Sequence, residues 1–404
     1  MDGQSGVADL AGLTDWRLLD GRACAWFDTP SHAASAALVT GSLESAAADL
    51  QPEFDLRARG VRVRLRTDPT AAREISELAA QLGLSADPSA LQEFGWVIET
   101  ADRPAVEPFW QAVLDYRAAE HGLSDPLRRD PAVRFGDLAD QRPLRNRLHL
   151  DVGRPADAVG RARSRVGQQP YGPWEVALAD TDGNEVDLCP GSRLSPASET
   201  SDWQTMFSAL AFYPTTSPGQ AVALAAAAAE AADSAGLPLL IDLRPEGVMI
   251  DSGKDEWEGA GGPDPMFVEL AGRVQQAARD LDLSADPTRD RFVQVGIDAG
   301  DVPALREFWR TVLGYRFDPR PGVTDIYDPR RLNPVIFFQG LDPADADRHR
   351  QRNRLHIGLT VPADRVQPVI DTVRQAGGRI VDDGGDDQLI LADPEGNEIR
   401  LSAS

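Results

Sequence analysis

Two histidines occupy the same place in a repeated motif. The motif Asn-Arg-Leu-His ends at His149 in the first copy and at His356 in the second. A second shared motif with a Gly-Asn pair follows each copy, in Asp180–Glu185 and in Asp393–Glu398. The imidazole of histidine has an ordinary pKa near neutral pH. Both histidines are therefore candidates for general acid–base chemistry.

Asp187 lies shortly after the first Gly-Asn motif and is a candidate partner of His149. A carboxylate beside an imidazole determines which ring nitrogen carries the proton. The alternative for both His149 and His356 is structural, because an imidazole in such a strand can hydrogen-bond a neighbouring loop. Trp96 has two interpretations as well, since it either lines a ligand cleft or fills the core.

The repeat extends beyond these motifs. Leu84–Pro88 recurs as Leu283–Pro287, and Pro108–Arg117 recurs as Glu307–Arg316. The offset between the copies rises slowly along the chain, as expected for a duplicated unit with insertions in its loops. Each unit divides near its Leu-Ser-Ala-Asp-Pro segment, which predicts four modules.

Composition limits the class of protein. The 404 residues have room for roughly two to four domains. The net charge of −23, without a basic stripe, argues against nucleic acid and anionic membranes as partners. No apolar run reaches the roughly 18 residues of a membrane span, and Met1–Gly12 lacks the pattern of a signal peptide. The two cysteines, Cys24 and Cys189, do not form a disulfide framework, which fits a cytoplasmic protein.

Hydrophobic spacing predicts an α+β fold. The first module has strands near Trp16–Trp26 and Val61–Leu65, with Arg62, Arg64 and Arg66 on an outer basic face, and an Ala-rich helix at 31–50. The second module has a strand at 94–100, an amphipathic helix from Val106, a strand at 147–152, a helix at 156–166 and a closing hairpin. The order is typical of a βαβββ unit.

The predicted organisation follows from these patterns. A polar segment rich in Ser separates the two halves of the chain. The predicted parts are a tail at 1–14, modules at 15–90 and 91–192, a linker at 193–202, and modules at 203–288 and 289–404.

The modules at 91–192 and 289–404 resemble glyoxalase-like domains of the vicinal oxygen chelate superfamily. The strand and helix at Asp298–Tyr315, the Asn-Arg-Leu-His strands and the Asp-Pro-Glu-Gly-Asn-Glu hairpin carry this resemblance. It implies paired βαβββ units that curl into a cleft for a small molecule.

The resemblance also implies four positions where metal-binding members of the superfamily place ligands. In the C-terminal domain these positions fall near Gln294, Gln339, His356 and Arg400. In the other domain they fall near Gly95, Gly136, His149 and Asp187. Glycine offers no ligand and arginine repels a cation, so we expect neither a metal nor another cofactor.

The modules at 15–90 and 203–288 resemble pterin-4a-carbinolamine dehydratase. The Trp16 strand, the segment Gln51-Pro52-Glu53 and the strand at 61–65 carry this resemblance. The family's His-His-Pro motif is replaced by Leu50-Gln51-Pro52, and the second copy has Gly236-Leu237-Pro238. Because these side chains do not transfer protons near neutral pH, we expect both modules to be degenerate. His32 is expected to be an exposed residue near a helix start.

Three functions follow as hypotheses. The first is a metal-independent enzyme of the lyase or isomerase type that acts on a small metabolite, as in secondary metabolism. An anionic metabolite is one option for its substrate. His356 would then be the acid or base, and Gln294, Gln339, Arg400 and Trp96 would hold the substrate. The second is a non-catalytic protein that binds an antibiotic or other metabolite. The third is a metal-dependent lyase or dioxygenase. The expected partner is a small molecule, and the chain is expected to be a monomer or homodimer.

Overall fold

The computed structural model describes residues 10, 12–44, 49–382 and 389–404. They form two compact units, and each unit takes two separate stretches of the chain. Unit 1 comprises the described parts of Met1–Leu91 and Gly191–Arg291, and unit 2 comprises those of Gln92–Pro190 and Phe292–Ser404. Most of the predicted tail, and part of the predicted helix at 31–50, lie outside the described residues.

The sheet of unit 1 has the strand order β1-β2-β4-β3-β15-β16-β14-β13. Its two halves come from separate stretches of the chain and join where β3 pairs antiparallel with β15, with Asp55 opposite Asp242. The strands are β1 (Trp16–Leu19), β2 (Arg22–Asp28), β3 (Glu53–Arg57), β4 (Gly60–Arg66), β13 (Gln204–Met206), β14 (Ser208–Pro214), β15 (Leu240–Arg244) and β16 (Gly247–Asp251), with the short β5 (Ser85–Ala86), β17 (Glu258–Gly259) and β18 (Gly262–Pro263).

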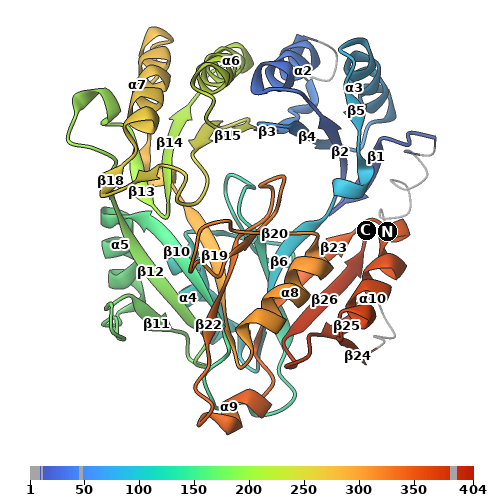
Figure 1. Ribbon diagram of the computed structural model, residues 1–404, viewed down its shortest axis with the longest axis vertical. Coiled ribbons are helices and arrows are strands. Elements are labelled where there is room, and N and C mark those ends of the chain that lie inside the picture. Colours follow the sequence, from blue (N-terminus) through green and yellow to red (C-terminus); the bar gives the residue numbers. More distant parts are fainter. Residues whose placement is uncertain (1–9, 11, 45–48, 383–388) are drawn as a thin grey trace. The chain divides into compact units, whose positions relative to one another are not determined.

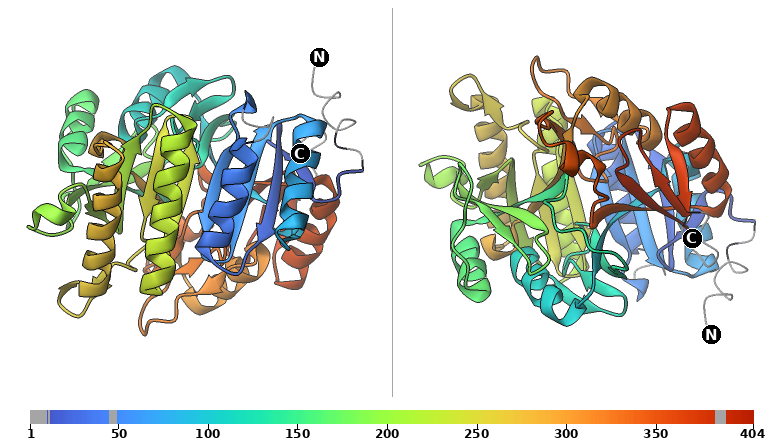
Figure 2. Two further views of the ribbon diagram at one scale, coloured as in Figure 1. Left: turned by 90° about the horizontal axis from the view of Figure 1, so that it is seen from above. Right: turned by 90° about the horizontal axis from the view of Figure 1, so that it is seen from below.

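Helices cover one face of this sheet. They are α2 (His32–Glu44), α3 (Pro69–Gln81), α6 (Pro218–Ala235) and α7 (Pro265–Asp280), and Figure 2 shows them side by side. The central helix α6 buries alanines such as Ala228 and Ala229, whose small side chains let it pack closely on α2. The short 3-10 turns of this unit are Pro88–Ala90, Ser198–Thr200 and Pro287–Arg289.

Two predictions for unit 1 are wrong. His32 is buried rather than exposed, because Asp233 caps the start of α2 and lies 2.9 Å from His32 Nδ1. Of the three arginines predicted on an outer basic face, Arg66 is exposed but Arg62 and Arg64 are not. Both are buried, and Arg62 Nε donates to Asp55 Oδ2 at 2.6 Å. The carboxylates on the neighbouring strand β3 therefore neutralise them.

Unit 2 contains two sheets with helices packed against them. Its elements are β6 (Glu93–Thr100), α4 (Arg103–Leu114), β7 (Arg117–Ala119), β8 (Gly122–Ser124), β9 (Ala132–Asp137), β10 (Leu148–Pro155), α5 (Ala156–Val166), β11 (Ala177–Ala179), β12 (Glu185–Arg193), β19 (Phe292–Ala299), α8 (Val302–Leu313), β20 (Arg316–Phe317), β21 (Ile326–Tyr327), β22 (Ile336–Gly340), α9 (Ala346–Arg350), β23 (Leu355–Val361), α10 (Val366–Gln375), β24 (Arg379–Asp382), β25 (Leu389–Ala392) and β26 (Glu398–Ala403). A 3-10 turn, Ala363–Arg365, precedes α10.

The two sheets exchange strands between the first and second stretches of unit 2. The first sheet has the order β24-β25-β26-β23-β6-β9-β8-β7, and the second has β12-β10-β19-β22-β21-β20 with β11 beside β12. Strand β6 therefore pairs with β23, and β10 pairs with β19 (Figure 1). The segments predicted as domains at 91–192 and 289–404 each contribute to both sheets. The predicted boundaries lie close to the junctions of the units, but the four-domain division stays a prediction.

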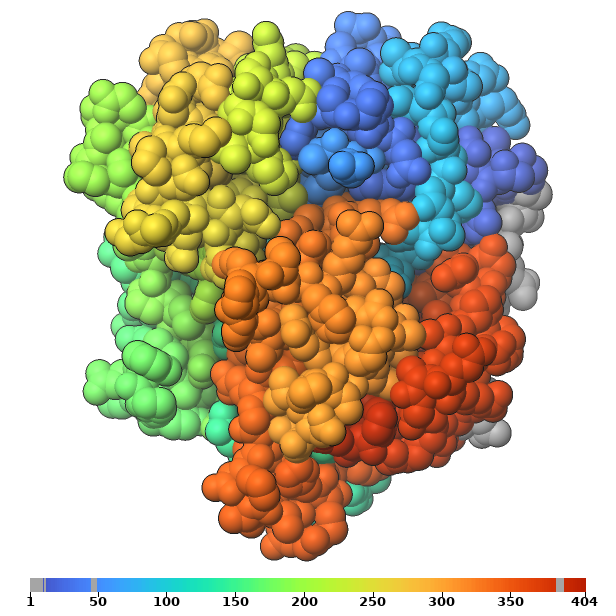
Figure 3. All heavy atoms as spheres, in the orientation of Figure 1, coloured from blue at the N-terminus to red at the C-terminus, as the bar shows by residue number. Residues whose placement is uncertain are grey.

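Helices α4 and α8 begin at aspartate caps and bury an aromatic face. Asp301 Oδ1 accepts from the backbone N–H of Ala304 at 3.0 Å at the start of α8. Trp110 on α4 and Trp309 on α8 are fully buried, and their indole N–H groups donate to Asp180 and Asp393. The outer face of α8 forms part of the surface in Figure 3.

The repeated Asn-Arg pairs tie the two stretches of unit 2 together. Asn146 Nδ2 donates to Asn184 Oδ1 at 2.7 Å, and Asn146 Oδ1 accepts from the backbone N–H of Arg354 at 2.8 Å. Asn353 does the same with Asn397 and with the backbone N–H of Arg147. Each asparagine thus holds its own Gly-Asn turn and the partner strand at once.

None of the described helices is both long and apolar enough to cross a bilayer.

Candidate functional site

The register of β10 and β19 shows which of their residues share one face of the sheet. On β10 and β19, His149 lies opposite Gly296 and Asp151 lies opposite Gln294, so these four positions share one face. Strand β12, which carries Asp187, is the other neighbour of β10. The sheet therefore gathers one imidazole, two carboxylates and one amide, which we call the His149 cluster (His149, Asp151, Asp187 and Gln294).

The His149 cluster is compact. One ligand atom each of His149, Asp151 and Asp187 lies within 4.8 Å of the others. His149 Nε2 is 3.5 Å from Asp151 Oδ1, and Gln294 Nε2 donates to Asp151 Oδ2 at 2.9 Å. The predicted neighbourhood of His149 and Asp187 is present in this arrangement, while Asp151 was not predicted.

Glycine at position 296 makes room for the imidazole. A Cβ at Gly296 would lie 2.4 Å from His149 Cε1 and 2.6 Å from Phe337 Cζ. The ring of Phe337 meets the ring of His149 edge to face, with centroids 5.6 Å apart. The imidazole is therefore held between β19 and an aromatic side chain of β22.

Burial shifts the acidity of the groups in this cluster. It raises the pKa of the Asp187 carboxyl, although His149 opposes this effect. Burial together with Asp151 and Asp187 raises the pKa of the Cys189 thiol to about 12. Cys189 is thus a protonated thiol at neutral pH, whereas Asp187 is partly exposed and can exchange a proton.

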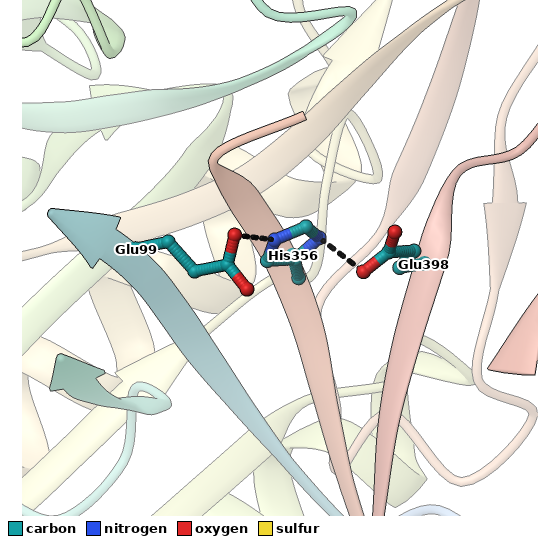
Figure 4. A group of neighbouring side chains, drawn as sticks. All are labelled: Glu99, His356 and Glu398. Carbon is teal, nitrogen blue, oxygen red and sulfur yellow. Dashed lines mark ion pairs between the residues drawn. The ribbon is translucent and has the colours of Figure 1, made fainter. Parts of the chain in front are cut away.

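The other sheet holds a second group, the His356 cluster (Glu99, His356 and Glu398). Glu99 comes from β6, His356 from β23 and Glu398 from β26 (Figure 4). His356 Nε2 is 3.4 Å from Glu99 Oε2, and His356 Nδ1 is 3.6 Å from Glu398 Oε2. Within the described residues neither ring nitrogen has a hydrogen-bond partner.

Three arginines surround the His356 cluster. Arg142 and Arg400 both contact Glu99, and Arg352 Nε donates to Glu398 Oε1 at 2.5 Å. Burial lowers the pKa of His356 to about 4, against the pull of Glu398. His356 is therefore a neutral, fully buried imidazole at pH 7.

The comparisons with known proteins agree with the architecture. The sequence profile of the glyoxalase-like domain matches residues 95–189 and 294–402, together half of the chain. The chain belongs to the glyoxalase-like family. The fold of this glyoxalase-like protein is a mixed α+β fold with strands and helices in both units.

Solved structures similar to this glyoxalase-like protein come from plants and bacteria. Glyoxalase I from Zea mays is 10% identical, with 77% of this chain and 93% of that chain covered and a TM-score of 0.37. A glyoxalase/bleomycin resistance protein/dioxygenase family enzyme from Burkholderia phytofirmans is 16% identical, with 27% and 94% covered and a TM-score of 0.21. No curated protein matches the chain.

The strand exchange divides the predicted site of the C-terminal glyoxalase-like domain. Gln294 on β19 and Gln339 on β22 lie in the sheet of His149, whereas His356 and Arg400 lie in the other sheet. The predicted grouping of these four residues is therefore wrong. It assumed that the two halves of one domain pair with each other. Gln339 lies at the exposed end of β22.

Two further sequence predictions have a structural outcome. Trp96 is 1% exposed and belongs to the hydrophobic core. Trp96 and Val97 are consecutive residues of β6, so their side chains point to opposite faces of the sheet. Lining a cleft is therefore the wrong interpretation of Trp96. Glu99 was missed as a site residue, although it follows Gly95 and Val97 at the strand period of two.

The two clusters of this glyoxalase-like protein differ in their fit to a metal ion. The His149 cluster fits a divalent cation, because it offers an imidazole, two carboxylates and the buried Oε1 of Gln294, which accepts no hydrogen bond from the described residues. The His356 cluster fits poorly, because Arg142, Arg352 and Arg400 already bind its carboxylates.

Two cavities lie away from both clusters. One of about 570 Å³ lies against α4 and α5, beside Pro108, Tyr116 and Asp180. The other, of about 210 Å³, is in unit 1 and includes Gln51, where a His-His-Pro motif would stand, and Arg244.

Proposed function

We propose that this protein is a glyoxalase-like enzyme that performs acid–base chemistry on a small organic molecule at the His149 cluster. The observation that carries this proposal is the carboxyl of Asp187, partly exposed and with a raised pKa, beside the buried His149. A carboxyl with a raised pKa holds a proton more readily than an ordinary carboxyl, which suits it to general acid–base chemistry. Elimination, isomerisation and rearrangement all need such a group.

The roles within the cluster follow from position. Asp187 is the group that reaches the substrate and accepts or gives the proton. His149, held by Phe337 and by the space at Gly296, lies beside Asp187 and limits the rise of its pKa. Gln294 donates to Asp151 and keeps that carboxylate turned toward the imidazole. In this proposal the reaction needs no metal.

The experiment begins with a thermal-shift screen of small metabolites, followed by mass spectrometry of each stabilising compound after incubation with the protein. Asp187→Asn should lower turnover by about 100-fold or more while the compound still binds. Asp157→Asn, the same change at an exposed position of α5, should leave turnover unaltered. Recovery of every stabilising compound unchanged would favour a binding or resistance protein instead.

A metal-dependent lyase or dioxygenase is the second candidate, supported by the donor set of the His149 cluster. His149, Asp151 and Asp187 would hold the ion, with the amide oxygen of Gln294 as a fourth donor. A bound divalent cation would polarise a substrate oxygen as a Lewis acid. Elemental analysis of the purified protein separates the candidates: one equivalent of metal, lost in Asp187→Asn, would replace the metal-independent proposal.

A further inference from the structure

One row of inward positions differs between the two sheets of unit 2. In the sheet of the His149 cluster, Asp151 lies opposite Gln294, and Asp187 is on the next strand. The sequence repeat aligns these positions with Gly358, Gly95 and Arg400. In the other sheet Gly358 lies opposite both Gly95 and Arg400, so two side chains are missing and a carboxylate is replaced by a guanidinium.

The missing side chains leave space above the backbone. A Cβ at Gly95 would meet only Ala132 O, at 3.5 Å, among the described atoms within 4 Å. A Cβ at Gly358 would meet Gly95 O and Val97 Cγ2, both at 3.4 Å, which is close to ordinary contact. Both glycines are partly exposed. Gly95 and Gly358 therefore form a stretch of main chain without side chains, which a ligand can approach and which we call the floor.

Polar atoms beside this floor lack partners. Within the described residues, Nε of Arg400 and both ring nitrogens of His356 make no hydrogen bond, although His356 is fully buried. His356 lies two residues before Gly358 on the same face of β23. A buried donor without a partner costs free energy, which a bound acceptor would recover.

The charge around the floor differs from that around the His149 cluster. Three arginines (Arg142, Arg352 and Arg400) contact three carboxylates, those of Glu99, Glu398 and Asp140, so the charges around the floor balance. Around the His149 cluster four carboxylates (Asp151, Asp187, Glu185 and Asp298) face two arginines (Arg145 and Arg348). The sheet of the His356 cluster is thus the less negative of the two, so an anion beside Arg400 meets less repulsion than it would at the His149 cluster.

We propose that Gly95, Gly358 and Arg400 form a binding site for the carboxylate of a small organic acid. The acid lies over the two glycines and accepts hydrogen bonds from the Arg400 guanidinium, in a charge-assisted pair. The site lies in the sheet that the proposed reaction does not use, so it is a second ligand site with its own selectivity.

Isothermal titration of the full chain with benzoate and with benzamide tests this site. Benzoate should bind and benzamide should not, because the amide lacks the charge. Arg400→Gln should weaken benzoate binding by at least about tenfold, as expected for the loss of a charge-assisted hydrogen bond. Gly358→Asp, which restores the residue of the other sheet, should weaken it as strongly, because it fills the floor and repels the anion.

Gly160→Asp is the matched control, since Gly160 is exposed on α5 with no described atom near its Cβ position. It adds the same charge and should leave benzoate binding unchanged. Circular dichroism of each variant confirms that it is folded, and Gly358→Asp decides the case if Arg400→Gln unfolds. The proposal is overturned if benzoate fails to bind, if benzamide binds equally well, or if neither site variant weakens binding more than the control.

Discussion

The two repeated imidazoles have different surroundings, although their sequence motifs are the same. His149 lies against Phe337 and two carboxylates, next to the partly exposed Asp187. His356 lies between two glutamates that arginines already bind. A proton relay needs contact with the substrate, so His149 and Asp187 suit the reaction, whereas His356 contributes buried polarity.

The lowered pKa of His356 predicts a loss of stability in acid. A histidine in the unfolded chain has a pKa of about 6.5, whereas burial brings the pKa of His356 to about 4. Between these values the unfolded chain binds a proton that the folded protein does not, so stability falls as the pH falls through this window. His356→Gln should reduce this loss by roughly 3 kcal/mol. Urea unfolding at several pH values measures it.

His121→Gln is the control for this prediction, because His121 is exposed. It should leave the dependence of unfolding free energy on pH unaltered. A His356→Gln protein whose stability falls as steeply as that of the unmodified protein would contradict the buried, neutral state of this imidazole.

At the scale of elements, the fit between β10 and β19 depends on a missing side chain. Gly296→Ala would bring a methyl group against the His149 ring and Phe337. We expect a loss of about 1–3 kcal/mol in unfolding free energy from this overpacking, together with reduced turnover as the imidazole moves. Gly340→Ala at the open end of β22 meets no described atom within 4 Å and should change neither. Equal behaviour of the two variants would show that the close approach is absent.

Local elements were predictable because their signals are local. Asp301 precedes α8 and accepts from Ala304 N–H at the helix start, and the positive φ of Gly396 explains the turn after Asp393. The pairing of Gly95 with Gly358 was not predictable. It depends on which half of the chain supplies the partner strand, and the register pattern of β6 fits either choice.

The candidate site was predicted only in part, because the pairing of strands from different halves of the chain was not predictable. The sequence placed His149 near Asp187, since both belong to one strand-exchanged segment. It combined Gln294 with His356, which lie in different sheets. Asp151 and Glu99 follow from the period of two along their strands, but only a known pairing shows that they face an imidazole.

At the scale of the whole molecule, both units are assembled from separated stretches of chain. We expect that cutting the chain at a specific protease site inserted between Pro196 and Ala197 leaves the two fragments together. The pairs β3–β15, β6–β23 and β10–β19 all join residues from opposite sides of the cut. Size-exclusion chromatography after cleavage measures this. Elution of two separate fragments without denaturant would contradict the strand exchange.

The strand exchange also bears on how selectivity could evolve. A shorter polypeptide with only one of the two matched segments would need a second molecule to complete its sheets, and every change in its gene would appear in two identical clefts. With both segments encoded in one reading frame, a mutation alters one cleft alone. Aspartate at 187 and arginine at 400 are such a pair of independent choices, so the two sheets of one gene product can present different charges to a ligand.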